Sequence, residues 1–383
     1  MPALIEEVTI LELLELAAQR RASDLHLAAG LPPLVRVDGR LLALDYEPLT
    51  PNECQRIVYD ILTDRQIGVF EDTHELDLSY GVPNLGRYRV NVYMQRSAVG
   101  AALRLIPSEI PSLEALALPR IVHELAEGTS GLVLVTGPTG SGKSTTLAAM
   151  LDKVNNERNE HILTIEDPIE YIHPHKGCIV NQREVHADTE GFAPALRAAL
   201  REDPDVVLIG EMRDLQTVEA ALRIAETGHL TFATLHTNSA AQTINRIVDI
   251  FPAHQQSQIR TQLSLVLEGI ICQSLLSKAN GPGRVIALEI LVPTPAIRNL
   301  IREDKIHQIY SAMQAGQEKV GMQTFNQSLA TLYLQRKISM NTALSASSLK
   351  DELTEMISRG AGVVAGAGLR RPGVPQPPGR QGR

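Results

Sequence analysis

The chain has 383 residues, 44% of them hydrophobic, which is enough for two or three domains with buried cores. A formal net charge of −8 and an aromatic content of 3% argue against a nucleic-acid-binding protein, because such proteins need clustered cations and stacking rings. Three separated cysteines provide no disulfide framework, and the sequence has neither a long apolar run nor a signal-peptide pattern. We therefore expect a cytoplasmic protein that reaches a membrane only through partners.

The first part of the chain, residues 1–110, predicts a small α+β domain. Apolar residues at helical spacing predict a helix over residues 1–20, and Thr50-Pro51 predicts the start of a second helix that runs to about Phe70. Alternating segments, with a hairpin turn at Asp38-Gly39, predict strands at 23–27, 34–37, 41–44, 77–80, 87–93 and 99–105. Helices on one face of an antiparallel sheet define this fold class.

The second part of the chain predicts an α/β domain. Prolines mark a linker at residues 111–120, and the domain follows at residues 121–358. Apolar runs that alternate with helical segments predict a mostly parallel sheet with strands at 132–136, 161–166, 205–210, 230–235 and 285–291. From Asp249 to about residue 358, helical patterns dominate. Residues 359–383 are rich in Gly, Pro and Arg, and this composition predicts a disordered, solvated tail; contact with a membrane surface or an acidic partner is the alternative.

The most specific motif lies between a predicted buried strand and a predicted helix, and it reads G-x-x-x-x-G-K-S. Its residues, with the threonine that follows, are Gly137, Pro138, Thr139, Gly140, Ser141, Gly142, Lys143, Ser144 and Thr145. The glycines let backbone N–H groups point at phosphate oxygens, Lys143 reaches the β- and γ-phosphates, and the Ser144 hydroxyl completes a Mg²⁺ shell. The motif predicts a nucleoside triphosphate site.

Two predicted strands after this loop end in acidic residues. The segment 162–171 contains Glu166, Asp167 and Glu170, of which one could polarise water and another could hold Mg²⁺ through water. The alternative is a solvated acidic loop. The segment 203–211 ends in Glu211, at the place where P-loop enzymes carry the acid beside Mg²⁺.

Histidines and arginines provide further candidates. His229 and His236 flank the predicted strand at 230–235 and could hydrogen-bond a γ-phosphate, although a histidine satisfied by local backbone is the alternative. His173, His175 and Cys178, with His186 further on, match no standard zinc spacing, so we expect a polar loop there. Arginines on the first domain could neutralise transition-state charge or could simply cover an exposed sheet face; they are Arg87, Arg89, Arg96 and Arg104.

Four stretches follow one another along the chain: the phosphate loop at 137–145, the acidic segments 162–171 and 203–211, and the segment 227–238 with its two histidines. In this order they resemble the secretion ATPase superfamily and in particular the PilT family of type IV pilus retraction ATPases. The resemblance covers residue 5 to about residue 355. Residues 23–27 match the family's S-D-L-H-L, and residues 296–303, A-I-R-N-L-I-R-E, are similar to its retraction signature. The pattern alone predicts a helix capped at Thr294, with Pro295 at its first position and with Ile297, Leu300 and Ile301 buried.

The resemblance implies an N-terminal PAS-like domain, a RecA-like ATPase domain, a homohexamer, and ATP and Mg²⁺ as ligands. It implies Glu170 as catalytic glutamate, Glu211 as the Walker-B acid, His229 and His236 as His-box residues, and Arg89 and Arg104 as trans-acting arginines. The implied partners are an inner-membrane pilus platform protein and a paralogous retraction ATPase, met at the cytoplasmic face of the inner membrane.

Other functions remain as alternatives. An accessory retraction ATPase of the PilU type would share these motifs. Pilus extension and type II secretion ATPases resemble the core but usually carry a four-cysteine zinc motif, which this chain lacks. A nucleic-acid motor conflicts with the acidic charge, and a ring that binds nucleotide without hydrolysing it conflicts with the acids at 170 and 211.

Overall fold

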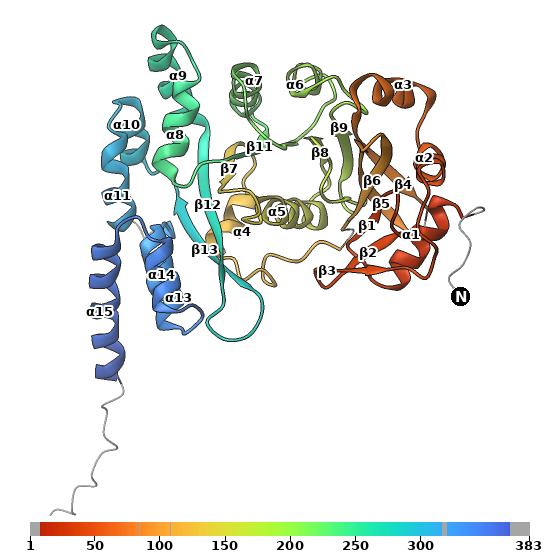
Figure 1. Ribbon diagram of the computed structural model, residues 1–383. Coiled ribbons are helices and arrows are strands. Elements are labelled where there is room, and N and C mark those ends of the chain that lie inside the picture. The colour runs from red at the N-terminus through yellow and green to blue at the C-terminus, as the bar shows by residue number, and fades with distance from the viewer. Residues whose placement is uncertain (1–7, 84, 108, 316–319, 368–383) are drawn as a thin grey trace, which may run out of the picture. The chain divides into compact units, whose positions relative to one another are not determined.

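The computed structural model describes residues 8–83, 85–107, 109–315 and 320–367 (Figure 1). The chain divides into two compact units. The first unit comprises Met1–Leu118 and Ser144–Glu211, and the second comprises Pro119–Lys143 and Met212–Arg383. Among the described residues, no helix has the length and apolar character needed to cross a membrane. Both units combine helices with sheet, so the fold is mixed α/β.

A six-stranded antiparallel sheet of order β3-β2-β1-β6-β5-β4 forms much of the first unit. Its strands are β1 (Asp24–Leu27), β2 (Leu34–Val37), β3 (Arg40–Ala43), β4 (Glu75–Val82), β5 (Gly86–Gln95) and β6 (Ala98–Ile106). The predicted turn at Asp38-Gly39 connects β2 to β3, and both residues have positive φ (48° and 80°), as a two-residue hairpin requires. The six strands predicted for this region are all present.

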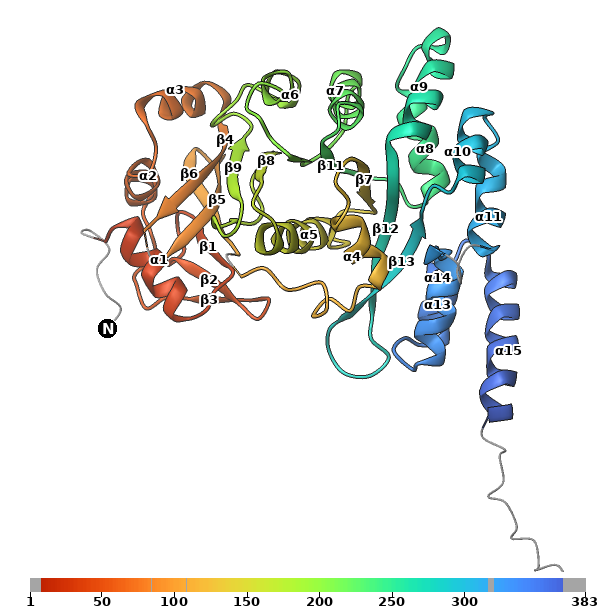
Figure 2. The same ribbon diagram turned by 180° about the vertical axis from the view of Figure 1, so that it is seen from behind.

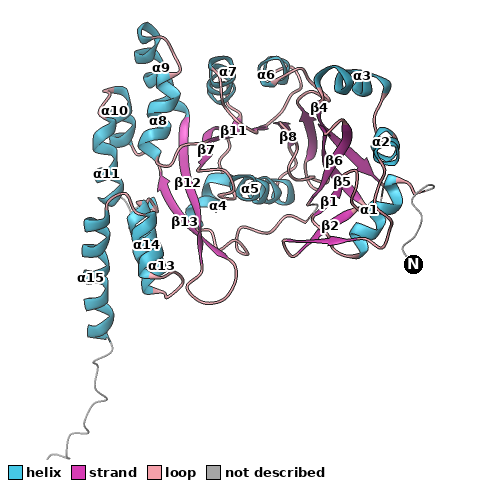
Figure 3. Ribbon diagram, in the orientation of Figure 1, coloured by secondary structure: helices cyan, strands magenta, loops and turns pink. Residues whose placement is uncertain are grey.

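Three helices cover one face of this sheet: α1 (Ile10–Gln19), α2 (Pro51–Tyr59) and α3 (Asp64–Thr73) (Figure 3). They bury side chains such as Leu14, Ile57 and Phe70 in a core with the sheet. The prediction of one helix from Thr50 to about Phe70 is wrong, because Thr63 forms a capping box with Gln66 and starts a separate helix. Of the predicted helix at 1–20, α1 is present, while residues 1–7 lie outside the described residues.

The first unit also contains a parallel segment with strand order β9-β8-β10. Its elements are α5 (Lys143–Glu157, whose first residue belongs to the second unit), β8 (His161–Glu166), β9 (Ile179–Glu184), α6 (Phe192–Ala199) and β10 (Val206–Ile209). The strands β8 and β10 match the predicted ones. The strand β9 was not predicted, because its sequence is largely polar and alternates only weakly between exposed and buried positions.

The second unit contains a sheet segment of order β13-β12-β7-β11, parallel except for the antiparallel pair β12-β13. The elements up to this hairpin are α4 (Arg120–Ala126), β7 (Gly131–Thr136), α7 (Leu215–Glu226), β11 (Leu230–Leu235), α8 (Ala240–Asp249), α9 (Ala253–Val266), β12 (Leu267–Ser277) and β13 (Arg284–Leu291). Figure 2 shows α8 beside β12 within this unit, and the two elements are in contact.

The expectation that helical patterns dominate from Asp249 is wrong for β12, whereas β13 matches the strand predicted at 285–291. Residues 267–277 form a strand that pairs with β7 on one side and β13 on the other. Residues 269–273 of this strand are buried in succession, so the sequence there has no period-2 alternation that would distinguish a strand from a buried helix.

Helices follow β13 (Figure 3): α10 (Pro295–Arg302), a 3₁₀ turn (Ile306–Gln308), α11 (Ile309–Ala315), α13 (Phe325–Leu334), α14 (Met340–Ala346) and α15 (Lys350–Ala367). The predicted start of α10 is confirmed, since Thr294 caps it and Pro295 occupies its first turn. Ile297 and Ile301 are buried as expected, whereas Leu300 is only half-buried. The helix α15 extends past the predicted boundary at residue 358, and the rest of the predicted tail, 368–383, lies outside the described residues.

Candidate active site

The predicted phosphate loop connects β7 to α5, as its motif requires. Gly137, Gly140 and Gly142 have φ values of 142°, 76° and 89°, which side chains disfavour. A Cβ atom on Gly137 would lie 2.2 Å from the carbonyl oxygen of Gln273, so glycine is required there by space as well. The loop backbone therefore has the curved form that can surround a phosphate group.

Within the second unit, the loop is held from β12. The Gln273 Nε2 atom donates a hydrogen bond of 2.8 Å to the Ser141 carbonyl oxygen, and Arg284 Nη1 lies 3.5 Å from the Gly140 carbonyl oxygen. The Lys143 ammonium is buried and donates to the carbonyl oxygens of Gly137 (2.9 Å) and Pro138 (3.2 Å). Gln273 was missed at the sequence level, because it lies on the strand that was not predicted.

Among the described residues, five buried side-chain polar atoms have no hydrogen-bond partner, and three of them lie at or beside this loop. These three are Thr136 Oγ1, Ser141 Oγ and Gln273 Oε1. Such atoms are rare in protein interiors and call for an explanation by a polar ligand or water. Together with the glycine cradle, they fit a loop that binds a phosphate.

In the first unit, the start of α5 contacts the acidic segment that follows β8. The hydroxyl groups of Thr145 and Tyr171 lie 3.0 Å apart. The carboxyl end of β10 lies beside that of β8, since Gly210 N–H donates to the Ile165 carbonyl oxygen at 2.8 Å. Glu166 ends β8 and Glu211 follows β10, so the structure brings these two acids to neighbouring strand ends.

Glu166 is buried and holds the backbone of the loop that follows it. Its carboxylate accepts hydrogen bonds from Thr164 Oγ1 (2.6 Å), Gln182 Nε2 (3.2 Å) and the Glu170 N–H (3.4 Å). Burial raises the pKa of Glu166 to about 6, although these hydrogen bonds counteract the rise. Glu170 itself is exposed on the loop, and Glu211 is half-buried.

The two histidines lie at opposite ends of β11. His236 follows the carboxyl end, where Leu235 is in register with Thr136 just before the phosphate loop. His229 precedes the amino end, roughly 20 Å away at about 3.3 Å per strand residue. Its Nδ1 atom lies 3.1 Å from the Ile224 carbonyl oxygen and 3.0 Å from Thr227 Oγ1. Within this unit, the structure brings His236 but not His229 to the loop's end of the sheet.

The arginines of the first unit form a row across the six-stranded sheet. Arg89 is directly opposite Arg104, which in turn is opposite Asp24, whose other neighbour is Arg36. Arg104 Nε donates to Asp24 at 2.8 Å, while Arg89 is exposed and has no ion-pair partner among the described residues. Burial opposes ionisation of Asp24, but hydrogen bonds from Ser23 and Arg104 outweigh it and lower its pKa. Arg89 and Arg104 are like charges on adjacent strands, an arrangement that is unfavourable in a sheet.

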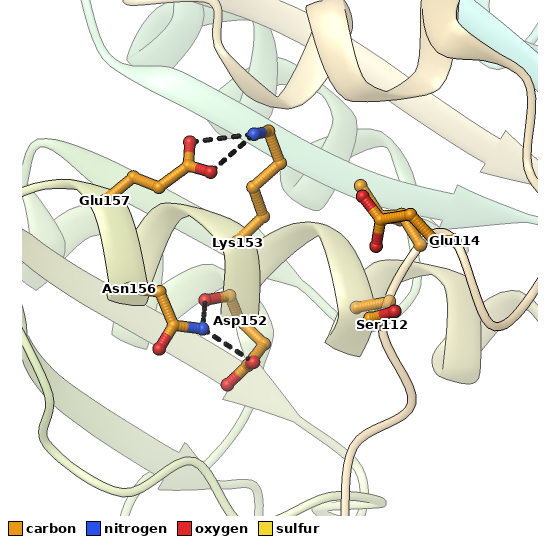
Figure 4. Close-up of a pocket in the computed structure, with 8 residues that line it drawn as sticks. Ser112, Glu114, Asp152, Lys153, Asn156 and Glu157 are labelled. Carbon is orange, nitrogen blue, oxygen red and sulfur yellow. Dashed lines mark hydrogen bonds and ion pairs between the residues drawn. The ribbon is translucent and has the colours of Figure 1, made fainter.

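A cavity of about 150 Å³ lies elsewhere in the first unit, and Figure 4 shows the side chains that surround it. It is lined by Ser112, Leu113, Glu114, Ala149, Asp152, Lys153, Asn156 and Glu157. Four of the five α5 residues among them belong to the second half of that helix, whereas most of the phosphate loop precedes its first residue. The cavity is smaller than typical ligand pockets. Two of the charged side chains that line it pair with each other, since Lys153 donates to Glu157 at 2.7 Å. It is not the nucleotide site.

A buried strand, a glycine loop that opens a helix, and further strands that end in acids define a P-loop ATPase of the α/β class. Residues 102–343 match the family model described as type II/IV secretion system protein. The chain is 54% identical to the type IV pilus retraction ATPase PilT of Pseudomonas aeruginosa, over 87% of this chain and 96% of that protein. It is 43% identical to the type IV pilus ATPase PilU of the same organism, over 91% of each.

A crystal structure of the pilus retraction motor PilT with bound ADP has a TM-score of 0.85 and 54% identity to this chain. The match covers 91% of this chain and 100% of that one. The chain therefore belongs to the type II/IV secretion system ATPase family, and within it to the PilT-type pilus retraction ATPases.

Proposed function

We propose that this protein is a Mg²⁺-dependent, homohexameric ATPase motor that retracts a type IV pilus and so produces twitching motility. The observation that carries the proposal is the hydrogen bond between the Thr145 and Tyr171 hydroxyl groups, in a chain of this family. It connects the start of α5, which follows the phosphate loop, to the acidic loop after β8. The identity to PilT, which is higher than that to PilU, favours the retraction motor over the accessory ATPase.

The residues divide the chemistry among them. The loop backbone and Lys143 bind the phosphates of ATP, and Glu170 orients the attacking water. Glu166 accepts a hydrogen bond from the Glu170 N–H and so fixes the backbone from which the Glu170 side chain projects. His236 lies at the appropriate end of its strand to hydrogen-bond the γ-phosphate, whereas His229 could act only on a nucleotide bound elsewhere.

The oxygen donors present fit Mg²⁺. Among the described residues, no group of three or more His, Cys, Asp and Glu side chains could hold a metal by themselves. Mg²⁺ is usually held by one or two carboxylates together with phosphates and water, and the Ser144 hydroxyl and Glu211 would supply those protein ligands. Bound there, the ion would neutralise charge that develops on the phosphates.

The organisation that we propose comprises a PAS-like domain at 1–110, a linker at 111–120, a RecA-like ATPase domain at 121–358 and a tail at 359–383. Arg89 and Arg104 would act in trans on nucleotide phosphates, since their row carries more positive than negative charge. In this proposal the ring works at the cytoplasmic face of the inner membrane, on a pilus platform protein and beside a paralogous ATPase.

The test is phosphate release by the purified protein, with its mass determined by light scattering. We expect a hexamer whose Mg²⁺-ATPase activity falls by about a hundredfold or more in Glu170→Gln. Asp167→Asn, an exposed acid on the same loop, is the matched control and should retain activity. If the protein binds ATP but releases no phosphate, it is a nucleotide-gated ring, and the proposal of an ATPase motor is wrong.

A further inference from the structure

Glu184, the last residue of β9, carries a buried carboxylate (3% exposed) that no predicted motif includes. It accepts hydrogen bonds from the Ser79 hydroxyl (2.7 Å), from Arg87 Nη2 (3.3 Å) and from the Ile169 N–H (3.2 Å). All of these residues belong to the first unit. One buried anion thus joins the six-stranded sheet to the loop after β8.

The Ile169 N–H directly precedes Glu170, so Glu184 fixes the backbone from which that side chain projects. The same loop is held by Glu166, which accepts the Glu170 N–H. Glu166 and Glu184 are register partners on β8 and β9, and the Val185 N–H donates to the Glu166 carbonyl oxygen at 2.8 Å. Two buried carboxylates on neighbouring strands therefore hold consecutive N–H groups of this loop.

The other end of the connection is the arginine row. Ser79 is directly opposite Arg89, which is directly opposite Arg104. Residues opposite one another in a sheet project to the same face, so the Ser79 hydroxyl lies at the end of that row. Arg87, two residues before Arg89, projects to the same face and forms an ion pair with Glu184.

We propose that Glu184 and Ser79 are positioning residues for ATP hydrolysis, which tie the loop of Glu170 to the strand row of Arg89 and Arg104. This proposal rests on the function proposed above. Neither residue touches the reacting atoms. When the arginines engage a phosphate, the row and the loop move together, because a buried carboxylate that loses its donors is strongly disfavoured.

The experiment measures kcat and KM for ATP by phosphate release from the purified full-length protein. We expect Glu184→Gln to lower kcat by about tenfold and to leave KM within about twofold, because the phosphate loop is untouched. Ser79→Ala should lower kcat by about threefold, and Ser79→Thr, which keeps the hydroxyl, should restore it. A merely structural role would not produce this separation of kcat from KM, nor rescue by threonine.

The matched control is Glu202→Gln. Glu202 accepts from Arg183, the residue before Glu184 on β9, at 2.7 Å, so this variant removes a neighbouring ion pair without touching the loop. It should keep the wild-type kcat. The proposal is overturned if Glu202→Gln loses as much activity as Glu184→Gln, or if kcat is unchanged in Ser79→Ala and Glu184→Gln.

Two further outcomes separate this proposal from the one on which it rests. If Glu184→Gln does not fold, the pair Ser79→Ala and Ser79→Thr decides alone, since it leaves Glu184 with its other donors. A wild-type protein without phosphate release would contradict the proposed function itself. Loss of activity in Glu170→Gln with full activity in Ser79→Ala would contradict the positioning role only.

Discussion

At the scale of single residues, the site depends on buried carboxylates that are fully hydrogen-bonded. Glu166 accepts from Thr164, Gln182 and the Glu170 N–H, and it still has a pKa of about 6 because it is removed from water. The exposed Glu170 is free to face substrate because Glu166 and Glu184 hold its backbone. In the proposed mechanism, the buried acids position the loop and the exposed Glu170 orients the attacking water.

The raised pKa of Glu166 predicts a pH dependence of stability. Between its ordinary pKa of 4.5 and about 6, the native protein holds a proton that the unfolded chain has lost, so stability falls as the pH rises through this window. Above it, the loss amounts to about 2 kcal/mol. We expect the free energy of unfolding of Glu166→Gln, relative to wild type, to rise by that amount between pH 4 and 7.5 in urea titrations.

His173 should give the opposite slope and serves as the comparison. Burial lowers the pKa of His173 to about 4, so the unfolded chain gains a proton first as the pH falls below 6.5. Wild type should therefore lose about 3 kcal/mol of stability through His173 on acidification, and His173→Gln should lack this loss. Parallel wild-type and variant curves would contradict either assignment.

At the scale of elements, the sequence predicted the parts whose patterns are local. The phosphate loop, the strands before Glu166 and Glu211, and the cap at Thr294 could be predicted from short windows. The strand β12 could not, because its residues 269–273 are buried in succession and give no period-2 alternation. Gln273 and Glu184 were missed because each acts through contacts that are distant in sequence.

The strand β12 yields a prediction for nucleotide binding. Gln273→Ala removes the side-chain amide that donates to the Ser141 carbonyl oxygen and leaves this buried group without that hydrogen bond. If the loss of this hydrogen bond reduces the binding free energy by about 1–2 kcal/mol, the affinity for ATP falls roughly tenfold. Calorimetric titration measures this affinity. Arg284→Ala, which removes an exposed contact of 3.5 Å to the same loop, should change the affinity less than twofold. Equal effects of the two variants would refute a special role for Gln273.

At the scale of the whole molecule, a motor must carry a change at the nucleotide to another part of the chain. In the second unit, β12 offers a direct connection. Gln273 on this strand binds the phosphate loop, and Glu268 near its start accepts from Arg298 Nη2 of α10 at 2.9 Å. Arg298 Nη1 also donates to the carbonyl oxygens of Ser264 (2.7 Å) and Leu265 (2.9 Å) at the end of α9. The helix α10 is therefore hydrogen-bonded to the same strand that contacts the phosphate loop.

This connection predicts a variant in which ATP turnover and pilus retraction separate. Arg298→Ala breaks the three hydrogen bonds of this side chain to Ser264, Leu265 and Glu268 but changes no residue of the phosphate loop, so phosphate release should stay within about threefold of wild type. Twitching, measured as colony spreading by a strain that carries only this variant, should be lost. Arg302→Ala, on the same helix but bonded only to Asn299 in the described contacts, should twitch normally. The prediction is contradicted if ATP turnover of Arg298→Ala falls together with motility, or if Arg298→Ala and Arg302→Ala lose motility alike. In either case α10 would support the fold in general and would not transmit the effect of hydrolysis.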